Sequence, residues 1–179
     1  TDELYWAQKG EGAWRNSVQI TVKQRSVEQS FVELECGGDH ERYMAAAKIL
    51  DGKKATILKS HGPGWRATAV ASGKFDATIR WAARGKIWDY APGTLLMTEA
   101  GAIPIYFDDK SPIDSRCFAF MSQPVYDEIG KELEEAMKNG QQELARQMLQ
   151  ALQQMMQNLQ MAQQPGQGQP GEGEQMMNQ

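Results

Sequence analysis

The stretch IWDYAPGTLLMTEAGA, residues 87 to 102, combines a helical pattern with a lone carboxylate at its start. The apolar run around Leu95 predicts a buried helix from Asp89 to Ala100, and Gly101 follows its end. Two explanations for Asp89 stay open. Aspartate is common at helix N-termini because its oxygens accept backbone N–H groups, and a carboxylate in that place is also a ligand that Mg²⁺ prefers.

The rest of residues 1–122 alternates between strand-like and helix-like segments. Strand patterns alternate apolar and polar residues, whereas the helical segments are rich in alanine and end at glycine. This alternation predicts a layered α/β domain with a largely buried sheet. We expect strands at 4–8, 17–24, 54–60, 75–81, 103–107 and 117–121, and helices at 41–50, 65–72 and 89–100.

The C-terminal residues divide into three further segments. A closing helix over 123–140 begins near Pro124 and is predicted to end at Asn139-Gly140. Residues 141–163 predict an amphipathic, Gln/Met-rich helix, and residues 164–179 form a Gly/Gln/Pro tail that we expect to be disordered. The amphipathic helix predicts a partner helix or a homo-oligomer, because apolar residues recur at steps of four, four, three and four: Leu144, Met148, Leu152, Met155 and Leu159.

Charge and cysteine content exclude several classes of protein. The net charge is −4, and residues 1–126 are nearly balanced with 16 Lys/Arg against 15 Asp/Glu, so neither nucleic acid nor an anionic membrane is an expected partner. Two isolated cysteines favour the reducing cytoplasm over a disulfide framework or a zinc site. No apolar run approaches the roughly 18–20 residues that span a bilayer.

The segment from Trp88-Asp89 to Gly101 resembles the C-terminal signature of the inositol monophosphatase family, which comprises magnesium-dependent, lithium-sensitive phosphatases. The family pattern is W-D-x-A-(A/P)-G, an apolar helix and then E-A-G-G, and only the last glycine differs here, as Ala102. Three more segments resemble the family in the same order, so that the resemblance covers residues 1–138: ELYWAQKGEGAWRNSVQITV, GPGWRATAVASGKFDA and SRCFAFM.

The resemblance implies the C-terminal half of that fold and a Mg²⁺-dependent hydrolysis of a small phosphorylated metabolite. It implies that Asp89 binds the second metal ion, and that Gly62 and Gly64 offer backbone N–H groups to the substrate. Pro63 has no N–H and stands where the family commonly has serine or threonine. Inositol phosphatases place a glutamate shortly before the Trp-Asp motif, whereas this sequence has Arg80, Arg84 and Lys86 in that window and no acidic residue. These cations are compatible with a more anionic substrate such as a nucleotide 3′-phosphate as well as with solvated loop charges.

Two family motifs are missing from this sequence. Family members carry a Glu-Glu pair and a D-P-(I/L)-D-G-T box upstream of the hairpin, and this sequence contains neither. A single carboxylate does not hold a catalytic Mg²⁺ tightly against water. We therefore expect this chain alone to be inactive and its sheet to expose one face. The alternative is a non-catalytic assembly protein that uses the helix 141–162.

Overall fold

The structure, a computed structural model, describes residues 2–59, 61–82, 84–108 and 110–162. Within these ranges the side chains of residues 140–148 and 160–162 are not described. The chain divides into two compact units, Thr1–Gly140 and Gln141–Gln179. The predicted disordered tail, 164–179, lies outside the described residues.

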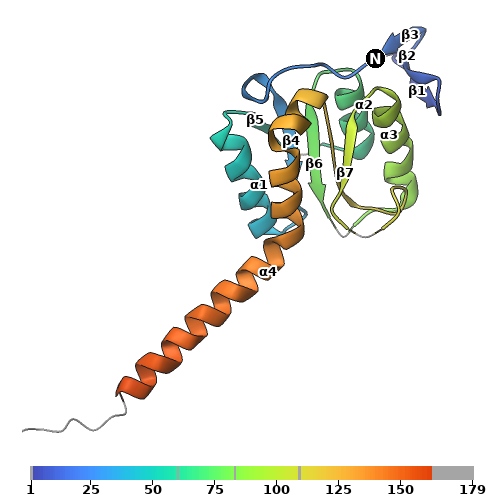
Figure 1. The fold of residues 1–179 in the computed structure, drawn as a ribbon. Helices are drawn as coiled ribbons and strands as arrows, with labels where there is room; N and C mark the ends of the chain where they lie inside the picture. Colours follow the sequence, from blue (N-terminus) through green and yellow to red (C-terminus); the bar gives the residue numbers. More distant parts are fainter. Residues whose placement is uncertain (1, 60, 83, 109, 163–179) are drawn as a thin grey trace, which may run out of the picture. The chain divides into compact units, whose positions relative to one another are not determined.

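A five-stranded sheet forms the centre of the first unit (Figure 1). Its order is β5-β4-β6-β8-β7, in which β4 pairs in parallel with β5 and β6, while β8 pairs antiparallel with β6 and β7. The expected α/β fold is thus confirmed. The strands are β4 (Phe31–Glu35), β5 (Thr56–Leu58), β6 (Ala77–Trp81), β7 (Ile103–Tyr106) and β8 (Cys117–Met121).

Helices cover both faces of this sheet (Figure 1). α1 (His40–Gly52) and the beginning of α4 (Gln123–Ala162) pack on one face, whereas α2 (Pro63–Ala71) and α3 (Ile87–Glu99) pack on the other. The expectation that the sheet exposes one face is therefore wrong. Four residues of α4 at steps of four are almost completely buried against the sheet: Val125, Ile129, Leu133 and Met137.

A second, three-stranded sheet lies at the start of the chain. β1 (Tyr5–Gln8), β2 (Gly12–Arg15) and β3 (Val18–Ile20) form an antiparallel meander. The sequence patterns predicted its first and third strands but not β2. The Glu99 carboxylate of α3 holds this sheet, because it accepts the N–H groups of Gly10 at 2.9 Å and of Gly12 at 3.0 Å.

The central strand β4 was also not predicted. Its sequence FVELE places Val32 and Leu34 in the core beneath α1 and α4, and Glu33 and Glu35 on the face beneath α2 and α3. Both neighbours of β4 are parallel, so the strand is buried on both faces, and acidic residues in such a strand conceal its pattern from sequence inspection.

α4 is one continuous helix, so the predicted helix end at Asn139-Gly140 is wrong. Good helix formers flank this pair, and one glycine costs a helix only about 1 kcal/mol. In the described ranges, no helix combines the length and the apolar character that crossing a membrane requires.

Candidate active site

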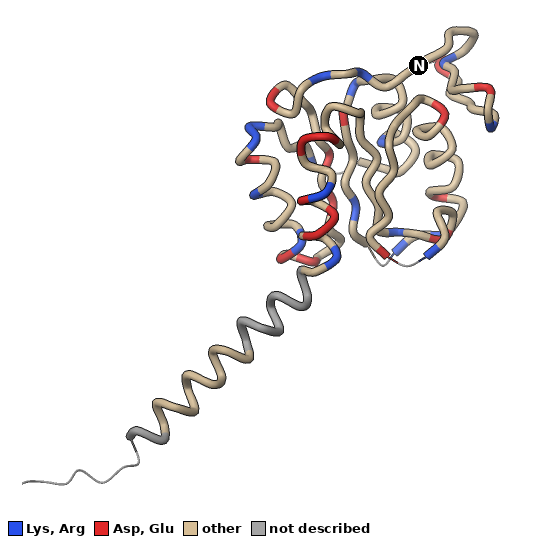
Figure 2. The backbone as a smooth tube through the Cα atoms, in the orientation of Figure 1, with Lys and Arg blue, Asp and Glu red and all other residues tan. Residues whose placement is uncertain are grey.

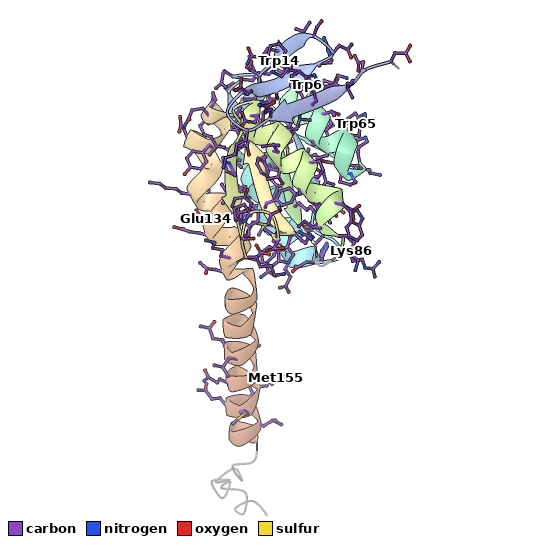
Figure 3. All side chains as sticks on the ribbon, turned by 90° about the vertical axis from the view of Figure 1, so that its right-hand side faces the viewer. Trp6, Trp14, Trp65, Lys86, Glu134 and Met155 are labelled. Atoms are coloured by element: carbon purple, nitrogen blue, oxygen red, sulfur yellow. The ribbon has the colours of Figure 1, made fainter. Side chains whose placement is uncertain are left out.

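Asp89 lies in the first turn of α3, which begins at Ile87. Its Oδ2 accepts the backbone N–H of Lys86 at 2.8 Å, and its own N–H donates to the Lys86 carbonyl at 2.9 Å. The half-buried carboxylate therefore stabilises the helix start, from the third helical position and not from the N-cap itself. Figure 3 shows Lys86 at the outer edge of the first unit, where α3 begins.

Three side chains fix the loop that leads into α3. The Arg84 carbonyl accepts Nη2 of Arg80 at 3.0 Å and the hydroxyl of Tyr90 at 3.3 Å, and the Gly85 carbonyl accepts Nε of Arg116 at 3.3 Å. Gly85 has φ +110°, and a Cβ added there would lie 2.2 Å from the Tyr90 ring. Only glycine fits this position, because both the backbone angle and the space exclude a side chain.

The Tyr90 ring is the centre of this contact. The Arg80 guanidinium lies 4.3 Å from the ring centroid and that of Arg116 lies 5.3 Å from it, within the range of cation–π attraction. Phe118 of β8 meets the same ring edge-on, with the centroids 6.1 Å apart. The start of α3 is thus attached to both β6 and β8.

A buried ion network joins β4, α2 and β6. Glu33 is 0% exposed and Arg66 is 2% exposed, and Nε of Arg66 donates to Glu33 at 2.6 Å. The Glu35 carboxylate accepts Nη2 of Arg66 at 2.6 Å and Nη1 of Arg80 at 2.5 Å. The Thr78 hydroxyl donates a hydrogen bond to the Glu33 carboxylate at 3.0 Å. Two carboxylates balance two guanidinium groups, which is the condition for keeping such charges inside a protein.

The turn Gly62-Pro63-Gly64 is attached to this network through the residue before it. The His61 N–H donates to Glu33 at 2.6 Å, and Nη2 of Arg66 donates to the His61 carbonyl at 3.1 Å. Gly62 is the N-cap of α2, and Pro63 lies in its first turn. Both glycines of the turn are exposed, and a Cβ added to either would meet nothing within 4 Å. The backbone of the turn is therefore open to solvent.

The described residues do not by themselves fit a Mg²⁺ site. Among them, no group of three or more His, Cys, Asp or Glu residues could hold a metal ion. Asp89 supplies one carboxylate, and one of its oxygens already accepts an N–H group. Asp114 lies in the exposed loop between β7 and β8, and its carboxylate accepts the Ser111 hydroxyl at 2.7 Å.

The structure links the predicted site residues through side chains that sequence inspection missed. Arg80 contacts the loop before Asp89 directly, and through Glu35 and Arg66 it is linked to His61, the residue before the Gly62-Pro63-Gly64 turn. The signal that could have revealed the network is the placement of polar or charged residues at alternate positions of apolar strands, in FVELE and ATIRW.

Comparison with known proteins agrees with this fold. The family model of the inositol monophosphatase family matches residues 1–157. The chain is 33% identical over 107 residues to the inositol-1-monophosphatase of Rhizobium meliloti (strain 1021), a match that covers 56% of this chain and 39% of that protein. It is 30% identical over 111 residues to the inositol monophosphatase of Dictyostelium discoideum, covering 58% of this chain and 40% of that protein.

Solved structures show the same fold. Extragenic suppressor protein suhB from Bartonella henselae superposes with a TM-score of 0.63 at 24% identity, covering 78% of this chain and 53% of that one. An IMPase from Thermotoga maritima superposes with a TM-score of 0.60 at 22% identity, covering 79% of this chain and 54% of that one. The chain therefore spans about half the length of these structures and 39–40% of the curated relatives. With a family model that matches nearly the whole chain, the Trp88-Asp89 motif and the shared fold, this chain belongs to the inositol monophosphatase family.

Proposed function

We propose that this chain is the C-terminal portion of a Mg²⁺-dependent phosphomonoesterase that hydrolyses a small phosphorylated metabolite, either an inositol phosphate or a nucleotide 3′-phosphate. The observation that carries the proposal is the family match over residues 1–157, which includes Asp89 at the first turn of α3. Similar structures have been solved with inositol monophosphate and with 2′-AMP bound, and both ligands are small phosphate esters.

In this proposal the side chains of the network hold two backbone segments in place. Glu33 and Arg66 fix the residue before Gly62, so that the N–H groups of Gly62 and Gly64 face the phosphate. Arg80 and Tyr90 fix the loop before Asp89. Arg80 already pairs with Glu35, so its contribution to substrate binding is a smaller one than its contribution to positioning.

Asp89 is proposed as one ligand of Mg²⁺, and the remaining ligands are proposed to come from polypeptide outside this chain. When bound beside Asp89, Mg²⁺ would supply polarisation of the phosphate ester and a lower pKa for an attacking water. Because a lone carboxylate does not hold this ion tightly, we expect the chain by itself to be inactive. The reducing cytoplasm remains the proposed location, in keeping with two free, buried cysteines.

The experiment joins the N-terminal part of the Rhizobium meliloti relative to this chain and measures phosphate release with Mg²⁺. We expect the chimera to hydrolyse inositol 1-phosphate or a nucleotide 3′-phosphate, and Asp89→Asn to abolish turnover. Asp114→Asn is the matched control, because Asp114 lies in an exposed loop. The chain alone should release no phosphate above background.

Two results would contradict the proposal. Strong turnover by the chain alone, lost in Asp89→Asn, would refute the expected inactivity. A chimera that folds, as judged by circular dichroism, but hydrolyses neither class of substrate would refute the phosphatase function and favour the non-catalytic assembly protein.

A further inference from the structure

The second part of α4 presents an apolar face to solvent. At about 3.6 residues per turn, its five large apolar side chains fall within an arc of about 120° on one side of the helix. Figure 3 shows Met155, one of the five, projecting from the helix. Each is more than half exposed: Leu149 58%, Leu152 57%, Met155 62%, Met156 61% and Leu159 60%. We name this surface the α4 stripe.

The α4 stripe is broader than the sequence pattern suggested. The predicted series contained Leu152, Met155 and Leu159, and the structure adds Leu149 and Met156 to the same exposed side. The side chains of the other two predicted members, Leu144 and Met148, are not described. In the described part of the second unit, α4 is the sole element, so nothing there covers the stripe.

Charge narrows the choice of partner. No Asp, Glu, Lys or Arg occurs between residues 147 and 162, and the described part of this segment carries neither blue nor red in Figure 2. A basic or acidic partner would find no complementary charge here, and an anionic membrane would find no lysine or arginine. Within residues 147–162, a second copy of the same segment meets no like charge in either orientation.

Spacing points to the same partner. Leu149, Leu152, Met156 and Leu159 are separated by three, four and three residues, which is the a/d spacing of a two-stranded coiled coil. These four residues form the seam of such a coiled coil. A seam packs best against a helix with the same spacing, and another copy of this chain supplies that helix. Most of the stability of a helix in a protein comes from packing of its apolar face, so pairing also stabilises the helix itself.

We propose that the α4 stripe is a homotypic surface through which two copies of this chain pair as a coiled coil. The pairing requires no other molecule and is independent of the phosphatase function, because none of the residues near Asp89, Gly62 or Gly64 takes part.

Sedimentation velocity of the full chain over a wide range of concentrations tests the proposal. We expect a concentration-dependent shift from one copy to two. Met156→Lys places a charge in the seam and should weaken pairing at least tenfold. Gln154→Lys is the matched control, since it adds the same charge and a comparable helix propensity on the opposite side of α4, and pairing should remain unchanged.

Leu152→Gln tests the seam without adding charge, because glutamine is a good helix former of similar length. Far-ultraviolet circular dichroism checks that each variant keeps its helix content at a concentration at which the unchanged chain is paired. A chain that sediments as one copy at every concentration overturns the proposal. Pairing that is equally strong in Met156→Lys and Gln154→Lys also overturns it, because the copies then meet through another surface.

The remaining alternative is that the α4 stripe binds an uncharged membrane, and neutral vesicles distinguish this binding from pairing. Phosphatidylcholine vesicles are mixed with the full chain and pelleted. A chain that is a monomer in buffer but pellets with the vesicles, and loses this binding in Leu152→Gln, would show that the α4 stripe is a membrane surface and would refute pairing.

Discussion

At the scale of single residues, the buried charges distinguish this domain. Glu33, Arg66 and Arg80 are each less than 5% exposed, and each lies on the side of the sheet that carries the candidate site. A buried ion pair contributes little net stability compared with an apolar pair, but removal of one partner leaves a charge without compensation. Removal of any one of these charged side chains should therefore destabilise the fold.

This leads to a prediction for Glu33→Gln. The substitution removes the charge opposite the Arg66 guanidinium and should lower the free energy of unfolding by about 3–5 kcal/mol. Glu28→Gln is the control, because its partner Lys54 is 76% exposed and such a surface pair contributes little. Urea denaturation followed by tryptophan fluorescence measures both. An equal, small effect in the two variants would show that the network is not needed for stability.

A second prediction concerns the Cys36 thiol. The pKa of Cys36 is raised from 9.0 to about 12, mainly because the thiol is buried and secondly because the Asp39 carboxylate lies nearby. The folded state therefore keeps this proton at a pH where the unfolded state has lost it, so stability should fall as pH rises from about 9 to about 12. Cys36→Ala should flatten that pH dependence. At pH 8 a maleimide should react slowly with the folded chain and rapidly after unfolding; rapid labelling of the folded chain would contradict the burial.

At the scale of elements, the contact between α2 and α3 depends on one glycine. A Cβ added at Gly93 would lie 2.7 Å from Cβ of Ala67, so the two helices approach too closely for a larger residue. Gly93 follows Pro92 inside α3, and both belong to the family motif that starts at Trp88. The motif therefore serves packing as well as chemistry.

The corresponding prediction is that Gly93→Ala destabilises the fold. In an open helix this change stabilises by roughly 0.5–1 kcal/mol, whereas the contact with Ala67 should reverse the sign and cost about 1–3 kcal/mol. Gly52→Ala is the matched control, because Gly52 ends α1 and its added Cβ meets nothing within 4 Å. Thermal unfolding of the two variants and of the unchanged chain tests this prediction. A melting temperature of Gly93→Ala above that of the unchanged chain would contradict it and show that α2 and α3 can move apart.

At the scale of the first unit, two sheets are held together by few bonds. The Glu99 carboxylate joins the meander β1–β3 to α3. Just after β3, the Val22 N–H donates to the carbonyl of Ala100, the residue after α3, at 2.9 Å. The five-stranded sheet has helices on both faces. Local opening should therefore begin in the meander, since protection follows burial and bonding.

Hydrogen exchange tests this arrangement. The amides of β4, β6 and β8 should exchange most slowly. Glu99→Ala should increase exchange in residues 5–20 and leave the five-stranded sheet unchanged, because it removes two charge-assisted bonds to Gly10 and Gly12. Glu11→Ala, an exposed position in the same meander, is the control. Uniform acceleration across both sheets would show that they open together.

The sequence by itself determined the fold class, the course of most helices and strands, and the family motif around Asp89. These features follow from local periodicity, from glycine and proline signals and from a fixed order of residues, all of which a single chain displays. Tertiary structure alone decided that Glu33 and Glu35 lie in a buried strand and that β2 completes a meander. It also decided that α4 continues through Gly140 and that Arg80 pairs with Glu35. These outcomes depend on partners far away in the chain: a buried carboxylate is stable only beside the guanidinium that balances its charge, and no local pattern states which residue will stand there.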